Sequence, residues 1–185
     1  MATAVDTRFD TEPDSALNAL FAPESVAIIG ASSDQRRFGG RPIQYLLEAG
    51  FAGPIYPINP KRDEIQGLKA YSSIRDVPGT VDCAMLAIGA DLTQATIEDC
   101  IAMGVKSAVL FGAGFSETGD EGKARQERLV ETARAAGMRL LGPNCMGLMN
   151  THARFYATFA SALEEGVPTP GRIAVASQSG GYGGY

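Results

Sequence analysis

The sequence has few of the residues from which many enzymes build their active sites. It contains 1 histidine and 3 cysteines in 185 residues, and no spacing of His, Cys, Asp or Glu is typical of a metal site. The cysteines, Cys83, Cys100 and Cys145, are odd in number and lie in apolar or helical surroundings, which favours free thiols in a reducing compartment. The first residues lack the basic and apolar regions of a secretory signal. We therefore expect a cytoplasmic protein.

Positive charge is also scarce, because 16 Lys and Arg face 21 Asp and Glu and the net charge is −5. Nucleic-acid binding needs clustered basic charge to neutralise phosphates, so we expect no nucleic-acid partner. No apolar run approaches the roughly 20 residues that span a bilayer, so we expect no membrane partner either. The composition is that of a soluble globular protein.

Glycine, in contrast, is abundant: 22 of 185 residues, or about 12% against a usual value of about 7%. The glycines separate short apolar runs that alternate with helical stretches. The runs predict strands at 25–30, 54–59, 81–88, 107–111 and 138–141, and the stretches predict helices at 16–21, 42–49, 92–103 and 121–136. This alternation predicts an α/β fold with a doubly wound, mainly parallel sheet and right-handed crossovers.

The domain organisation follows from where this alternation begins and ends. Residues 1–14 are polar and without periodicity, which predicts a flexible N-terminus, and 15–170 form the main domain. Residues 142–170 are irregular. A further strand is expected at 172–176, followed by Ser177-Gln-Ser-Gly180, which normally opens a helix. Residues 171–185 are therefore expected to begin a second, truncated domain, in a fragment or in a chain that another polypeptide completes.

Ligands of a doubly wound sheet bind outside the carboxyl ends of its strands. After the first expected strand come Gly30-Ala-Ser-Ser33 and Arg36-Arg-Phe-Gly-Gly40. Small residues before a helix N-terminus favour a phosphate site, although the spacing is not Gly-x-Gly-x-x-Gly and a plain turn is the alternative. After the second strand, Lys61 and Arg62 stand where an NAD site has an acidic residue. They favour a phosphorylated ribose, as in coenzyme A or NADP, over two simply solvated cations.

Other strand ends are less specific. Residues 88–90 and 111–113 are small-residue edges that suit adenine or a pantetheine arm. Cys145, in the irregular stretch 142–147, has no nearby His or Asp pattern to activate it, so a structural or ligand-lining thiol is favoured over a nucleophile. His152 is expected to be a surface residue. The acidic residues of the helical region are expected to form a solvated face: Glu117, Asp120, Glu121, Glu127 and Glu131.

Six segments, in one order, together resemble a known family: Ser25-Val-Ala-Ile-Ile-Gly-Ala-Ser32, Ile55-Tyr-Pro-Ile-Asn-Pro-Lys61, Gly67-Leu-Lys-Ala-Tyr71, Ala113-Gly-Phe-Ser-Glu117, Leu141-Gly-Pro-Asn-Cys145 and Ser177-Gln-Ser-Gly180. They resemble the CoA-binding domain of NDP-forming acyl-CoA synthetases, relatives of the succinyl-CoA synthetase α subunit. The resemblance covers about residues 20 to 180 and implies a Rossmann-like domain that holds coenzyme A, followed by the first strand of a flavodoxin-like domain.

The resemblance also implies particular cofactor contacts, although a proline frequent after the third strand of the family is Gly89 here. The expected CoA-binding residues are Gly30, Ala31, Ser32, Ser33, Arg36, Arg37, Phe38, Gly39, Lys61, Ile88, Gly89, Ala90, Phe111, Gly112, Ala113, Asn144 and Cys145. No catalytic residue is expected, because the phosphorylated histidine of the family lies in a later domain and His152 does not match it.

The function implied is that of one part of an acid–CoA ligase, which joins a carboxylic acid to CoA at the expense of ATP. ATP and Mg would be used only in the complete enzyme, with the remaining ligase and ATP-grasp domains as partners, and this chain should be inactive by itself. Two alternatives remain. One is a stand-alone CoA-binding module with a regulatory or carrier role, and the other is an NADP-dependent oxidoreductase domain.

Overall fold

The computed structural model describes residues 15–180 of the chain. The expected flexible segment 1–14 lies outside the described residues, as does the end of the expected second domain, 181–185. Within the described range no helix is both long and apolar enough to cross a membrane.

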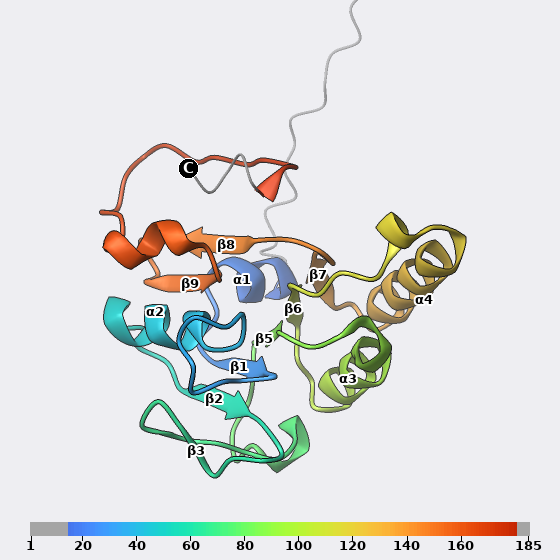
Figure 1. The fold of residues 1–185 in the computed structure, drawn as a ribbon, viewed down its shortest axis with the longest axis horizontal. Helices are drawn as coiled ribbons and strands as arrows, with labels where there is room; N and C mark the ends of the chain where they lie inside the picture. Colours follow the sequence, from blue (N-terminus) through green and yellow to red (C-terminus); the bar gives the residue numbers. More distant parts are fainter. Residues whose placement is uncertain (1–14, 181–185) are drawn as a thin grey trace, which may run out of the picture.

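The centre of the fold is one parallel five-stranded sheet (Figure 1), which confirms the predicted α/β architecture. The strand order is β2-β1-β5-β6-β7. The strands are β1 (Val26–Ile29), β2 (Ile55–Ile58), β5 (Cys83–Leu86), β6 (Ser107–Leu110) and β7 (Arg139–Leu141). In β1, β5 and β6 all four residues are buried, as expected of parallel strands that are covered on both faces.

Helices cover both faces of this sheet, as Figure 1 shows. They are α1 (Ser15–Phe21), α2 (Arg41–Ala49), α3 (Ala90–Ala102) and α4 (Asp120–Ala135). Successive residues of a strand point to opposite faces, so Ala27 packs in one core cluster with α3 and α4. Its neighbours Val26 and Ile28 pack in the other cluster with α1 and α2. The sheet is therefore doubly wound, as predicted.

A small hairpin lies between β2 and β5, where the sequence analysis predicts no strand. It consists of β3 (Glu64–Ile65) and β4 (Leu68–Lys69), which pair antiparallel. Gln66 and Gly67, with φ of 51° and 78°, form the two-residue turn that joins two such strands. A 3-10 turn, η1 (Ile74–Asp76), leads on to β5.

A second hairpin lies within residues 142–170, which the sequence predicts to be irregular; that prediction is wrong here. It consists of β8 (Gly147–Asn150) and β9 (Phe155–Thr158), followed by η3 (Ser161–Glu165). All four residues of β9 are buried. The hairpin forms because it packs on α2, where the Tyr45 hydroxyl donates a hydrogen bond to the carbonyl of Ala160 at 2.8 Å.

The strand expected at 172–176 is not confirmed, because the structure gives these residues no strand. Ile173 and Val175 are 90% and 83% exposed. An alternating apolar pattern needs a neighbouring strand to bond with, and within residues 15–180 this segment has none.

Candidate functional site

The loops that follow β1 and β5 meet at the carboxyl edge of the sheet. The chain runs from β1 outward to β2 and then returns to β5 on the other side of β1. Such a reversal leaves a crevice between the two loops, and ligands of doubly wound folds bind there. The loop at 30–40, predicted to bind phosphate, lies at this point.

Two glycines let this loop approach its neighbours closely. Gly30 has φ of 83°, and a Cβ there would lie 2.4 Å from the carbonyl oxygen of Ala87. A Cβ on Gly39 would lie 2.0 Å from the carbonyl oxygen of Gly30. The loop folds back on itself, and the Ser32 N–H donates to the Gly39 carbonyl at 3.2 Å. Because no side chain fits at either glycine, the backbone itself forms the wall of the site.

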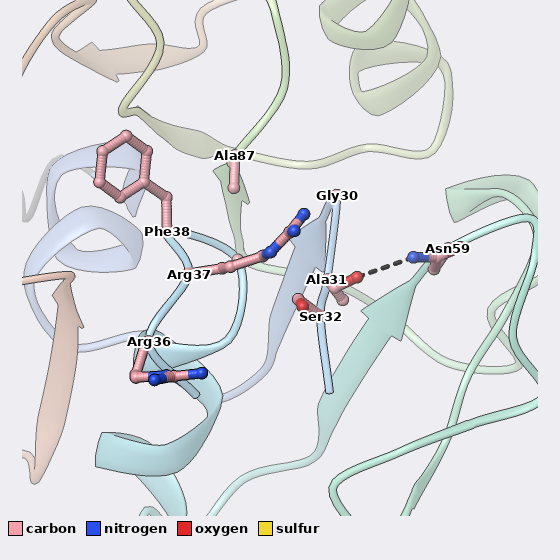
Figure 2. Close-up of a pocket in the computed structure, with 9 residues that line it drawn as sticks. Gly30, Ala31, Ser32, Arg36, Arg37, Phe38, Asn59 and Ala87 are labelled. Carbon is pink, nitrogen blue, oxygen red and sulfur yellow. Dashed lines mark hydrogen bonds between the residues drawn. The ribbon is translucent and has the colours of Figure 1, made fainter. Parts of the chain in front are cut away.

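Two adjoining cavities lie over this loop. The first has a volume of about 570 Å³ and is drawn in Figure 2; it is lined by Gly30, Ala31, Ser32, Arg36, Arg37, Phe38, Gly39, Asn59 and Ala87. The second, of about 650 Å³, is lined by Ser32, Ser33, Asp34, Arg37, Asn59, Lys61 and Arg62. Ser32, Arg37 and Asn59 line both, so the two form one groove that runs from the sheet edge to the end of β2. We call it the loop groove.

The loop groove is rich in positive charge. Arg36, Arg37, Lys61 and Arg62 line it together with one carboxylate, Asp34. Asp34 accepts a hydrogen bond from the backbone N–H of Arg36 at 3.0 Å, and this bond lowers the pKa of its carboxyl. Its oxygens also lie 3.4 Å from Arg36 Nε and 3.7 Å from Arg37 Nε. Figure 2 shows the Arg37 side chain directed toward Gly30 and Ala31.

Three residues of the groove were not predicted: Asp34, described above, Ala87 and Asn59. Ala87 lines it from the end of β5, and Asn59 joins the ends of β1 and β2. Asn59 donates from Nδ2 to the Ala31 carbonyl at 2.8 Å and accepts at Oδ1 from the Lys61 N–H at 2.9 Å. The sequence did contain a signal for Asn59, because this residue stands at the end of a predicted strand, where ligands bind, and immediately before Pro60 and Lys61.

The other predicted contacts lie beside the groove, and none of them lines its two cavities. Gly89 is the N-cap of α3, and its carbonyl accepts from Thr93 Oγ1 at 3.1 Å. Gly112 packs against this turn, since a Cβ there would lie 2.6 Å from the Ile88 carbonyl oxygen. The Gly112 carbonyl in turn accepts from the Asn144 N–H at 3.0 Å. These loops form one continuous strip of backbone along the sheet edge.

An aromatic row connects the groove to this strip. Phe38 is 56% exposed, and the centroid of its ring lies 4.4 Å from the centroid of the Phe159 ring. Phe159 lies 5.3 Å from Phe111 in an edge-on arrangement. The groove therefore has one apolar wall next to its basic floor.

Cys145 has the features of a structural or ligand-lining thiol. Burial raises the pKa of its thiol, and its Sγ lies 3.4 Å from the Leu110 carbonyl oxygen. A neutral thiol is a poor nucleophile, so the structure gives no support to the nucleophile hypothesis. His152 is exposed, with Nε2 at 2.9 Å from the Gly171 carbonyl oxygen.

Glu117 corrects one expectation, because it is not part of a solvated helix face. It lies in the 3-10 turn η2 (Ser116–Thr118), where Oε1 accepts hydrogen bonds from the backbone N–H groups of Gly114 and Phe115. These bonds lower the pKa of its carboxyl. Nowhere in residues 15–180 do three or more His, Cys, Asp or Glu gather in a way that could hold a metal ion.

A backbone-lined loop at the reversal point of a parallel sheet, with basic side chains and one apolar wall, defines the class of protein. It is a nucleotide-type cofactor domain whose ligand carries phosphates. Comparison with known proteins gives the family: the family model described as "CoA binding domain" matches residues 24–151. The chain belongs to this CoA-binding domain family.

Individual relatives agree with the family. The chain is 42% identical over 167 residues to the α subunit of acetate–CoA ligase [ADP-forming] II from Pyrococcus furiosus, with 90% of this chain and 35% of the relative covered. The solved structure of PH0766 from Pyrococcus horikoshii OT3 is 41% identical, with a TM-score of 0.83 over 91% of this chain and 37% of that one. The chain thus spans about a third of the length of these relatives.

A third relative is a dinucleotide-forming acetyl-coenzyme A synthetase 1 from Ca. Korarchaeum cryptofilum, solved with phosphate and ADP. It is 42% identical, with a TM-score of 0.74 over 79% of this chain and 31% of that one. Both structural matches reproduce the parallel α/β fold described above.

Proposed function

We propose that the loop groove holds the phosphates of coenzyme A. The pyrophosphate lies against the backbone of residues 30–33 and 36–39, with Arg36 and Arg37 as its cations. The 3′-phosphate of the ribose lies at Lys61, with Arg62 beside it. The observation that carries this proposal is the groove itself, since its two cavities join the glycine-walled loop to the basic end of β2.

The pantetheine arm then follows the strip of backbone beside the groove. Phe38 and the row of aromatic rings behind it offer apolar contact for the arm. Residues 88–90 and 111–113, together with Asn144, offer backbone groups and an amide to the polar atoms of pantetheine. Cys145, held neutral by burial, lines the path without reacting.

The complete protein, in this proposal, is an ADP-forming acid–CoA ligase of the cytoplasm. It makes an acyl-CoA from a carboxylic acid, CoA and ATP with Mg, and its reactive histidine lies outside this chain. Support comes from the Pyrococcus furiosus relative, which is named as a subunit of an ADP-forming acetate–CoA ligase and of which this chain covers 35%. The chain contributes the CoA site, residues 171–185 begin the next domain, and the remaining ligase and ATP-grasp domains complete the enzyme.

The test is a calorimetric titration of the 185-residue chain with CoA, 3′-dephospho-CoA and NADP in parallel. We expect CoA to bind, dephospho-CoA to bind more weakly, and NADP to give no comparable heat. Binding of NADP without a response to CoA would contradict the proposal and favour an oxidoreductase domain. Equal affinity for CoA and dephospho-CoA would contradict the placement of the 3′-phosphate at Lys61.

A further inference from the structure

One side chain from outside the loop groove contacts both ends of the phosphate-binding loop. Gln66 lies in the turn between β3 and β4, about thirty residues later in the chain. Its Nε2 donates to the carbonyl of Ser32 at 3.0 Å and to the carbonyl of Gly40 at 2.9 Å. Both protons of this amide are therefore used on the loop.

These two hydrogen bonds affect how well the loop can bind an anion. A carbonyl oxygen repels a phosphate, and the two that Gln66 engages belong to the first and last residues of the segment 32–40. Within residues 15–180, the N–H groups of Phe38 and Gly39 have no intramolecular acceptor. An arrangement in which the loop carbonyls are bonded to a fixed donor and the loop amides are free suits anion binding.

The backbone at Gln66 gives a second, independent observation. Its φ of 51° lies in the left-handed region, where glycine, asparagine and aspartate are favoured and a longer side chain is uncommon. The turn is anchored by Ile65, which is fully buried. Gln66 is thus held in a backbone conformation that is unfavourable for glutamine, at a place where its amide reaches the loop. Residues in unfavourable backbone conformations concentrate at functional sites.

We propose that Gln66 is a positioning residue for the cofactor: it fixes the loop 32–40 in the conformation that binds the pyrophosphate of CoA. This inference rests on the proposed function of the groove. Gln66 acts through the loop and does not touch the ribose phosphate at Lys61. Loss of the Gln66 amide should therefore weaken the binding of CoA and of 3′-dephospho-CoA by the same factor.

The test is the variant Gln66→Met, which keeps the length of the side chain but donates no hydrogen bond. Calorimetry of the full chain should give roughly ten-fold weaker binding of both CoA and 3′-dephospho-CoA. Without ligand, amide hydrogen exchange should become faster at residues 32–40 only. The matched control is Gln94→Met in α3, because the amide of Gln94 bonds to Glu98 and Thr132 and not to the loop; its affinity for CoA should not change.

A second variant, Gln66→Asn, guards against a failure to fold. Asparagine suits the left-handed turn but is too short to reach both carbonyls, so it should fold and still lose affinity. If Gln66→Met and Gln66→Asn bind CoA as tightly as the unaltered chain, the positioning role is wrong while the proposed function stands. A lower melting temperature with unchanged affinity would reduce Gln66 to a structural residue. No CoA binding by the unaltered chain would instead refute the proposed function, and the role of Gln66 with it.

Discussion

Asn59 bonds to the carbonyl of Ala31 across 2.8 Å, from the end of β2 to the end of β1. The same side chain accepts from the N–H of Lys61 at 2.9 Å. One amide therefore sets the distance between the glycine-walled loop and the cation that follows β2. In the proposed site this fixes the spacing between the pyrophosphate and the 3′-phosphate of one CoA molecule.

The variant Lys61→Ala should lose the preference for the ribose phosphate. Removing a charged hydrogen bond costs about 1.5–3 kcal/mol, and because Lys61 is exposed we expect the low end, about ten-fold in affinity. Titration should show weaker binding of CoA and unchanged binding of 3′-dephospho-CoA. Lys123→Ala, an exposed lysine of α4, is the control and should change neither. An equal loss for both ligands would contradict a specific contact to the 3′-phosphate.

The variant Asp34→Asn should bind CoA more tightly than the unaltered chain. Asp34 is ionised at neutral pH, as an aspartate normally is, and its pKa is lowered further by the Arg36 N–H. Its charge opposes incoming phosphates and pairs with Arg36 and Arg37. Asparagine keeps an oxygen for the Arg36 N–H but removes the charge. Since exposed pairs contribute at most about 1 kcal/mol, we expect a gain of roughly two- to five-fold at low salt that fades as salt is added. A loss of affinity would indicate that Asp34 is needed to arrange the arginines.

The variant Gly39→Ala should destabilise the fold as well as the site. The new Cβ would lie 2.0 Å from the Gly30 carbonyl oxygen, so the backbone must move. We expect the free energy of unfolding to fall by more than about 2 kcal/mol, as for other overpacked sites. Gly171→Ala is the matched control, since nothing lies within 4 Å of its Cβ, and it should change stability by no more than about 0.5 kcal/mol. Urea unfolding of both variants measures the difference.

The free energy of unfolding should fall at alkaline pH because two thiols are buried in their neutral form. Burial raises the pKa of Cys83 and of Cys100 from 9.0 to about 12. The unfolded chain releases these protons first, so their contribution is fully present below pH 9 and is lost as the pH rises toward 12. The double variant Cys83→Ala with Cys100→Ala should be less stable at pH 7 but should lose less between pH 9 and 11. Equal pH dependence of the two proteins, measured by urea unfolding, would contradict neutral buried thiols.

The three central strands, β1, β5 and β6, were predictable because every one of their residues is buried. Val26-Ala-Ile-Ile29 and Cys83-Ala-Met-Leu86 are continuous apolar runs, and a continuous run between glycines is a local signal that needs no knowledge of the partner. The loop residues at 30–39 followed from the same reasoning, since the site of a doubly wound sheet lies where its strands end.

The features that were missed or not confirmed depend on distant contacts. β9 is buried because it packs on α2, more than a hundred residues earlier in the chain, and its four residues give no such signal by themselves. Residues 172–176 have the alternating pattern of a strand, yet a pattern cannot supply a neighbour to bond with. Asn59 and Gln66 are ordinary polar residues in the sequence, and only the fold reveals which carbonyls they reach.

The contacts that cover α2 also set an order of events during synthesis. Arg41 Nη1 and the Tyr45 hydroxyl bond to the carbonyls of Phe159 and Ala160, which are 118 and 115 residues later in the chain. At translation rates of about 5–20 residues per second, roughly 6–24 s separate the two partners on the ribosome. During this interval the nascent chain contains the glycine-walled loop and its helix without their outer cover. The region that would bind the cofactor is thus among the last parts of the described fold to gain all its tertiary contacts during translation.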